Sequence, residues 1–360
     1  MTAFLIILPF ILIYTIFVVW AERKVAGFVQ DRLGPVEVGY KGLLQTIADL
    51  LKLIQKEDLV PKAGIRIIFL SAPVVIVAAI LSGFSTIPLS PNCIGSSTEV
   101  GAFYLISIIS LDVIGYIMAG WGSNNKYSTL GAMRAVAQII SYEVPLTLII
   151  LAMLMIGQTL DLQELSFQQS YLYTGQSYLF GLKSLNINIS DMGGVLSWNI
   201  IRFPFAIIGF VVFFIASLAE ANRGPFDIAE AESEIIAGFH TEYSGFRWSM
   251  IMLGEYAILL LMALLGTILF FGGWNTPFPN IGDIRLAEWT TGDIKGISGL
   301  LWGMFWLFSK AIIWILVSLW VRWTYPRLRI DQLMYFCWKV LTPLSILFVL
   351  LAGVWRLMMI

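Results

Sequence analysis

Eight apolar runs, each long enough to cross a bilayer as a helix, follow one another along this chain of 360 residues. A transmembrane helix needs about 20 apolar residues. Hydrophobic residues make up 58% of the chain and charged residues only 12%, whereas soluble domains carry about 25% charged residues. We therefore predict an all-α integral membrane protein, a single polytopic domain over residues 1–360 with eight transmembrane helices. The predicted spans are residues 3–21, 66–88, 101–121, 136–157, 199–219, 249–271, 300–321 and 338–358.

Lys and Arg residues are distributed unevenly between the two sets of loops. Of the 22 in the chain, sixteen lie in or beside the loops after odd-numbered spans, five lie beside the other loops, and Lys310 lies within a span. Because basic residues concentrate in cytoplasmic loops, we predict that the first set faces the cytoplasm and that both termini face the periplasm. The N-terminal run has no basic n-region and no cleavage site, so we expect it to remain as the first span.

The first cytoplasmic loop contains a helical pattern of its own. Apolar residues recur there every three or four positions, with polar residues between them: Leu43, Leu44, Ile47, Leu50, Leu51 and Ile54. This spacing predicts an amphipathic helix over about residues 41–56, lying on the membrane or against the bundle. For the outer loop, residues 158–198, the polar composition predicts a hairpin or short helices.

Residues that could hold a redox centre are scarce. The chain has two cysteines, Cys93 and Cys337, and one histidine, His240. An iron–sulfur cluster typically needs four ligands and a bis-His haem needs two histidines, so we predict that this chain alone binds no metal and no redox cofactor. The two cysteines fall near opposite membrane faces, which argues against a disulfide. The net charge of −1 argues against nucleic acid as a partner.

Ionisable side chains interrupt several of the apolar runs. Lys310 and Asp112 lie in the middle of two runs, and Glu143 and Glu255 lie about one turn inside two others. A charge in hydrocarbon is costly, and chains tolerate it where the group is paired or lines a wet path. Glu143, Glu220 and Glu255 fall at a similar depth on three spans, so they either converge or form separate buried pairs. Asp112 is either a proton site or a hydrogen-bonding partner.

Two cytoplasmic segments carry opposite charge. The first, residues 218–247, has an acidic excess against the positive-inside tendency: Glu220, Asp227, Glu230, Glu232, Glu234 and Glu242. Like charges held close together raise the pKa of at least one of them, which suits proton exchange near neutral pH. The alternative is a solvated acidic loop. The second segment, residues 321–339, could pair with the first or bind an anionic headgroup through its arginines.

Five long segments of the chain resemble the membrane-arm subunit designated H in the NADH:quinone oxidoreductase family, respiratory complex I. They read AERKVAGFVQDRLGP from residue 21, GLLQTIADLLKLIQKED from residue 42, AGWGSNNKYSTLGAMRAVAQIISYEVPL from residue 119, AEANRGPFDIAEAESEIIAGFHTEYSG from residue 219 and TYPRLRIDQLMYFCWK from residue 324. The resemblance implies a protein that couples quinone reduction to proton translocation and has no redox centre or catalytic residue of its own.

The family resemblance also implies roles for particular residues. Those implied at the quinone channel are Arg23, Arg32 and Asp49. Those implied on the proton path are Glu143, Glu220, Asp227, Glu230, Glu232, Glu234 and Glu255. The basic counterpart is Arg322, Arg327 and Arg329, with the intramembrane Lys310. The implied substrate is ubiquinone or menaquinone, with FMN and iron–sulfur clusters in partner subunits.

The same resemblance implies the setting of the chain. It places the chain in the bacterial cytoplasmic (inner) membrane, beside lipid, adjacent membrane-arm subunits and soluble quinone-module subunits. Two positions depart from the family pattern: Val36 follows Gly34-Pro35 where an asparagine is usual, and Asp112 stands where a small or apolar residue is expected. An alternative is the anchor protein of a membrane-bound hydrogenase-type complex. A stand-alone transporter would usually show matched halves, which this sequence lacks.

Overall fold

The computed structural model describes residues 2–96, 98–173, 192–229, 232–280, 284–293 and 296–359, together with positions 175, 178, 180 and 189. Within these residues every extended regular element is a helix, and an isolated β-bridge joins Ser90 to Cys93. The prediction of an all-helical chain is therefore confirmed for the described part. Both cysteines, Cys93 and Cys337, are free thiols.

The helices have the following bounds. The α-helices are α1 Thr2–Val29, α2 Gln45–Gln55, α3 Arg66–Gly83, α4 Gly101–Ile109, α5 Leu111–Gly122, α6 Lys126–Gly157, α7 Leu162–Phe167, α8 Asn199–Arg202, α9 Ala206–Glu220, α10 Glu232–Ile235, α11 Gly245–Phe270, α12 Leu286–Thr291, α13 Ile297–Thr324, α14 Ile330–Phe336 and α15 Thr342–Met359. Short 3₁₀ turns lie at Tyr40–Gly42, Phe84–Thr86, Gly194–Ser197 and Gly238–His240.

Six helical stretches in the described residues are long and apolar enough to cross a membrane. They are Arg66–Thr86, Gly101–Gly122, Lys126–Gly157, Gly245–Phe270, Ile297–Thr324 and Ile330–Met358. Helix α9 is apolar but shorter. These stretches correspond to six of the eight predicted spans, whereas α1 and the shorter α9, at the positions of the other two, are not among the six.

Several predicted spans differ in detail from the helices observed. Span 101–121 divides at Ser110 into α4 and α5. Span 199–219 divides between Arg202 and Ala206, since Pro204 has no N–H to continue a helix. The last helical stretch begins at Ile330 rather than at residue 338 and passes through a π-helical turn, Cys337–Leu341. Its first turns are too polar to register as an apolar run.

Helix α6 also starts earlier than predicted, at Lys126 rather than at residue 136. The cause is a local cap, because the Asn125 side chain accepts a hydrogen bond of 3.0 Å from the Tyr127 amide. Such a cap satisfies one of the amides left free at a helix start. The polar residues that follow belong to the helix but not to its apolar portion.

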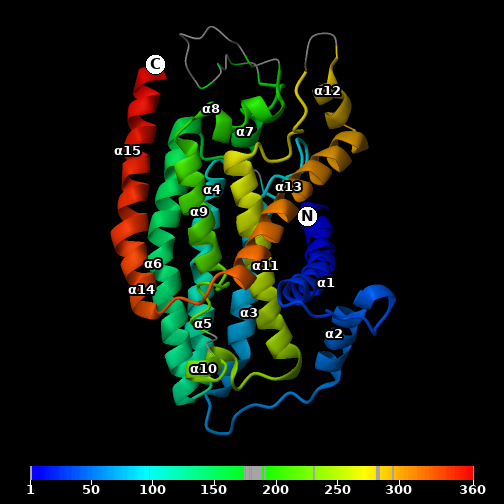
Figure 1. Ribbon diagram of the computed structural model, residues 1–360, viewed down its shortest axis with the longest axis vertical. Coiled ribbons are helices and arrows are strands. Elements are labelled where there is room, and N and C mark those ends of the chain that lie inside the picture. Colours follow the sequence, from blue (N-terminus) through cyan, green and yellow to red (C-terminus); the bar gives the residue numbers. More distant parts are fainter. Residues whose placement is uncertain are drawn as a thin grey trace.

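Helix α11 forms the centre of the bundle. It packs against α3, α9 and α13, and 89% of its apolar stretch is buried, the largest share of any of the six stretches. Figure 1 shows α3, α5, α6, α9 and α15 running roughly parallel to it. Close approach in the bundle depends on small residues, since a Cβ on Gly115 of α5 would lie 2.3 Å from Ile76 of α3.

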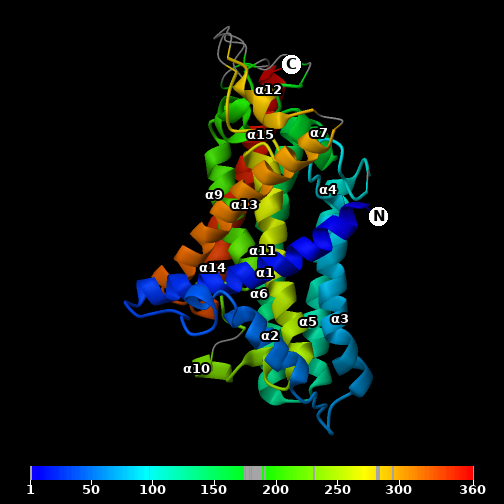
Figure 2. The same ribbon diagram turned by 90° about the vertical axis from the view of Figure 1, so that its right-hand side faces the viewer.

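Helix α1 does not follow the direction of the bundle. Figure 2 shows it slanting across α3 and α11, and Figure 1 shows α13 crossing diagonally. Helices α2 and α10 lie at one end of the molecule, whereas α7, α8, α12 and the C-terminal end of α15 lie at the other. The slanted α1 leaves space beside α11, and α2 packs against both helices.

Candidate functional site

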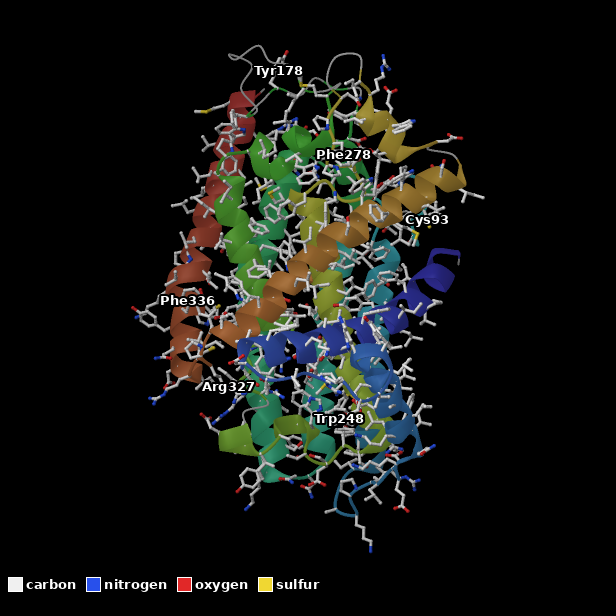
Figure 3. All side chains as sticks on the ribbon, turned by 45° about the vertical axis from the view of Figure 1, so that its right-hand side comes forward. Cys93, Tyr178, Trp248, Phe278, Arg327 and Phe336 are labelled. Carbon is white, nitrogen blue, oxygen red and sulfur yellow. The ribbon has the colours of Figure 1, made fainter. Side chains whose placement is uncertain are left out.

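A cavity of about 760 Å³ lies between α1, α2, α11 and the end of α13. Apolar side chains such as Ile16, Leu50 and Met252 form much of its wall. Charged side chains line this cavity at only a few points. Mostly apolar walls with a few polar groups are typical of small-molecule sites. Figure 3 shows Trp248, another wall residue, toward the same end of the molecule as Arg327.

All three residues predicted at the quinone channel line this cavity. Arg23 of α1 pairs with Asp49 of α2 across 2.6 Å between Nη1 and Oδ2. Gln45 donates a 3.3 Å hydrogen bond to the other oxygen of Asp49. Arg32, in the loop after α1, donates through Nε to the Gln30 side chain at 2.6 Å. The Arg23 side chain is 45% exposed, so this pair orients two groups more than it stabilises the fold.

Glu22, next to Arg23, is a functional candidate that the sequence analysis missed. Its carboxylate is buried and pairs with Arg223 at 3.1 Å and, through its other oxygen, with Arg322. The Tyr256 hydroxyl donates to the same carboxylate at 2.8 Å. Because Glu22 and Arg23 are neighbours on a helix, they point in different directions, Glu22 into the bundle and Arg23 toward α2.

Arg223 is held by more than this one carboxylate. Its guanidinium lies over the Tyr256 ring, 4.0 Å from the ring centroid, in a cation–π arrangement. Burial alone would lower the pKa of Arg223, but nearby Tyr256, Glu22 and Glu255 raise it well above its ordinary value. The guanidinium therefore stays charged at the cavity wall. Arg223 was not among the predicted site residues, although it lies inside the acidic segment.

Glu255 connects the cavity to a buried histidine. It lines the cavity from α11, and its Oε1 lies 3.2 Å from Nε2 of His240. Both side chains are almost fully buried, at 5% and 4% exposure. His240 reaches this position from the 3₁₀ turn Gly238–His240. The sequence analysis assigned no site role to His240, and the geometry joins it to a predicted proton-path residue.

Glu143 and Glu220 meet deeper in the bundle. They line a common cavity of about 10 Å³ together with Ser110, close to the least volume that can hold one water molecule. Both carboxyl oxygens of Glu220 are buried without a hydrogen-bond partner among the described residues. Asp112 is fully buried and lies within electrostatic range of both glutamates.

The sequence analysis left open whether the predicted carboxylates converge or form separate buried pairs, and the structure shows both arrangements. Glu143 and Glu220 converge, and Asp112 joins them, whereas Glu255 pairs with His240. We refer to Asp112, Glu143 and Glu220 as the carboxylate cluster. A carboxyl buried without hydrogen bonds is costly unless it binds a proton or a water molecule. The carboxylate cluster is therefore suited to exchanging protons.

The acidic and basic segments meet at one ion pair among the described residues. Asp227 pairs with Arg327 at 3.2 Å. Glu234 pairs instead with Arg134 of α6 at 2.5 Å, and Arg322 pairs with Glu22. Arg329 precedes α14 as its N-cap residue and makes no ion pair within the described part of the chain. Glu230 and the side chain of Glu232 lie outside the described residues.

Lys310 contacts backbone rather than carboxylate groups. Its Nζ donates 2.8 Å hydrogen bonds to the carbonyl oxygens of Phe271 and Asn275, at and beyond the end of α11. The Trp198 ring lies beneath it, with its centroid 4.8 Å from Nζ. Carbonyl groups at a helix C-terminus carry partial negative charge and favour a cation. The lysine therefore caps the C-terminal end of α11, away from Arg322, Arg327 and Arg329, with which it was grouped.

Together, the fold and the site define a multi-pass membrane protein with a charged cavity near one end and carboxyl groups buried in its interior. In the described part no group of three or more His, Cys, Asp or Glu residues is arranged to hold a metal ion. The NADH dehydrogenase family model matches residues 1–353. The chain belongs to this family and is a membrane-arm subunit of respiratory complex I, an oxidoreductase and translocase assembly.

Curated relatives agree over nearly the full length. The chain is 57% identical to the NADH-quinone oxidoreductase subunit designated H 2 of Cytophaga hutchinsonii over 355 residues, which cover 98% of this chain and 97% of the relative. It is 43% identical to the subunit designated H of Chlorobaculum parvum, over 97% of this chain and 90% of the relative. Identity to the corresponding protein of Chlorobium luteolum is 45%, over 97% and 87%. The predicted family resemblance is confirmed.

Proposed function

We propose that the cavity between α1, α2, α11 and α13 receives the headgroup of a lipid quinone. The observation that carries this proposal is that Arg23, Arg32 and Asp49 line one cavity of about 760 Å³ with apolar walls. An apolar wall suits the prenyl tail of a quinone, and charged groups at few points suit its carbonyl oxygens. The relatives are named as quinone oxidoreductase subunits, which agrees with this substrate.

The proposed proton path begins at the cavity wall. Glu255 faces the cavity and contacts His240, so a charge change on the quinone would be felt at that pair. The carboxylate cluster lies farther inside the bundle and holds groups suited to passing a proton onward. In the acidic segment, Glu234 pairs with Arg134 of α6 and Asp227 pairs with Arg327 of the loop between α13 and α14. Charge coupling between neighbouring groups is the proposed link between quinone reduction and proton movement.

The proposed membrane arrangement has eight spans. Helices α1 and α9 would complete the six long stretches, and α2 would lie along the membrane surface with exposed Leu51 and Ile54 toward lipid or a partner. The end that carries α2 and α10 would face the cytoplasm of a bacterial inner membrane, and both termini would face the periplasm. We expect FMN and iron–sulfur clusters in partner subunits and none in this chain.

This orientation predicts opposite labelling of two exposed positions. Tyr40, 76% exposed, lies in the loop before α2, and Trp289, 83% exposed, lies on α12. In a background with Cys93→Ala and Cys337→Ala, Tyr40→Cys should react with an impermeant thiol reagent only from the cytoplasmic side. Trp289→Cys should react only from the periplasmic side. Labelling of both cysteines from one face would refute the proposed eight-span arrangement.

Removing the pair between α1 and α2 should impair quinone reduction alone. Arg23→Ala and Asp49→Asn each leave a charged or polar group unpartnered at the cavity wall, and we expect the NADH:quinone rate to fall by about tenfold or more, the loss expected for removing a charge-assisted hydrogen bond. Electron transfer from NADH to a hydrophilic acceptor should be unchanged, because that acceptor need not enter the cavity. Both rates are measured in membranes with matched complex content.

Another partly exposed ion pair provides a matched control for the Arg23 and Asp49 variants. Arg247 pairs with Asp58 at 2.7 Å and is also partly exposed, but neither residue lines the cavity. Arg247→Ala should leave the quinone rate near that of the parent. Equal loss of both electron-transfer rates in the Arg23 and Asp49 variants would indicate failed assembly and contradict a role in the quinone site.

A further inference from the structure

A second, polar cavity lies at the opposite end of the bundle. It has a volume of about 310 Å³ and is bounded by the C-terminal end of α6, by α7, by α8 and by the last turns of α15. Figure 1 shows these elements meeting at the end away from α2 and α10. Two arginines, Arg202 and Arg356, line it, and the only acidic residue in its described wall is Glu164. The lining therefore has a net positive charge.

Neither arginine has an anionic partner in the described part of the chain. Both Nε atoms are buried without a hydrogen-bond partner. No carboxylate, Glu164 included, lies within ion-pair distance of either guanidinium among these residues. The contact of Arg202 with the Phe203 ring, 5.4 Å from the ring centroid, supplies no hydrogen bond. Buried donors without acceptors are rare in folded proteins, so a partner of the right chemistry is expected to fill this cavity.

The arginines do not serve simply as caps of α6. Carbonyl groups at a helix end attract cations, but a capping role would use hydrogen bonds from guanidinium to carbonyl, and none is present in the described residues. The Gly157 carbonyl accepts its hydrogen bond from the Gln168 amide, at 2.8 Å. Hydrogen bonds also fix the wall, since the Asn199 side chain donates to the Leu269 carbonyl at 2.9 Å. The cavity is thus held open by groups other than the two arginines.

We propose that Arg202 and Arg356 bind a phosphate-class anion in this cavity, either the phosphodiester of a phospholipid headgroup or free phosphate. Guanidinium groups present paired donors that match two phosphate oxygens at once. Gln168 and Tyr173, also on the wall, can donate to the remaining oxygens. Because α6 and α15 both end here, the cavity lies where a spanning bundle meets headgroups, and such basic pockets suit anionic lipids.

The test compares the intact complex carrying Arg202→Gln and Arg356→Gln together with the parent complex. Each is delipidated in detergent, offered micelles of phosphatidylglycerol or of phosphatidylcholine, washed, and assayed for bound phosphorus. We expect the parent to retain on the order of one more phosphatidylglycerol per complex than the variant, since one cavity holds one phosphate between two guanidinium groups. The control Arg285→Gln removes an exposed arginine that pairs with Glu288 outside the cavity and should match the parent.

A second arm separates the two sources of phosphate. Inorganic phosphate without lipid should raise the thermal unfolding midpoint of the parent, and not of the double variant, if a soluble anion is the ligand. If the double variant fails to assemble, Arg202→Lys with Arg356→Lys keeps both charges but loses the paired donors, and retention should weaken by about tenfold. Equal phosphatidylglycerol retention and equal response to phosphate in parent and assembled variant, glutamine or lysine, would overturn the proposal.

Discussion

Replacing Glu22 with glutamine will remove most of the quinone reductase activity and lower the thermal unfolding midpoint of the complex. One buried carboxylate lies between two arginines, Arg223 and Arg322, and accepts the Tyr256 hydroxyl. Removing one partner of a buried ion pair costs about 3–5 kcal/mol, because the remaining charge stays buried without compensation. Here two cations would lose their shared anion at the wall of the proposed quinone cavity.

The Glu22 prediction has an internal control. Glu22→Asp keeps the charge and should retain more activity and stability than Glu22→Gln. Adding Arg322→Gln to Glu22→Gln removes one of the two uncompensated cations and should recover part of the lost unfolding midpoint. The measurements are the thermal midpoint of the purified complex and the ratio of quinone to hydrophilic-acceptor rates. Parent-like values for Glu22→Gln in both would show that the buried network has no role in stability or quinone reduction.

Glutamine variants of Glu143 and Glu220 will assemble but lose most of their coupled activity. Glutamine keeps the shape and polarity of glutamate and removes the titrating proton, and proton transfer by a placed side chain is worth about 10²–10⁴ in rate. Because the two residues share one small cavity, losing either should interrupt the same step. Glu→Asp should retain more activity, and Asp112→Asn should act in the same direction as the glutamine variants.

Quinone reductase rate and proton pumping are measured for these variants in membranes with matched complex content. Glu288→Gln, an exposed glutamate paired with Arg285, provides the control and should behave like the parent. If Glu143→Gln, Glu220→Gln and Asp112→Asn all pump and turn over like the parent, the carboxylate cluster is a structural feature. The proposed path would then have to leave Glu255 by another route.

Local patterns predicted the helices better than they predicted the contacts between them. Apolar runs located the long helices because a run of about 20 apolar residues has few other solutions. The break after Arg202 was not predicted, since bundles often tolerate a proline such as Pro204 inside a helix. The break at Ser110 has no proline nearby to indicate it. The search for apolar runs missed α14 because its first residues are polar, although α14 and α15 form one continuous helical stretch.

The site shows why contacts between distant residues are not predicted by one sequence. Arg23 and Asp49 are 26 residues apart and were expected in one site only through the family resemblance. Glu22 meets partners 201 and 300 residues farther along the chain, and no spacing within the sequence encodes that meeting. The one signal in the sequence that could have pointed to Glu22 was its position beside Arg23, at the end of the first apolar run. Asp112 gave a clearer one, as an ionisable residue in an apolar run.

The slant of α1 has a consequence for the ion pairs that Glu22 makes with Arg223 and Arg322. Helix α1 has 28 residues and is therefore about 42 Å long, and it slants across α3 and α11. Glu22 lies about 30 Å from its start at about 1.5 Å per residue, and a rotation of about 5° about that start would move it roughly 2.6 Å. Such a movement exceeds what an ion pair survives. The two ion pairs of Glu22 with Arg223 and Arg322 therefore restrain α1 far from its start, at the wall of the cavity beside α11.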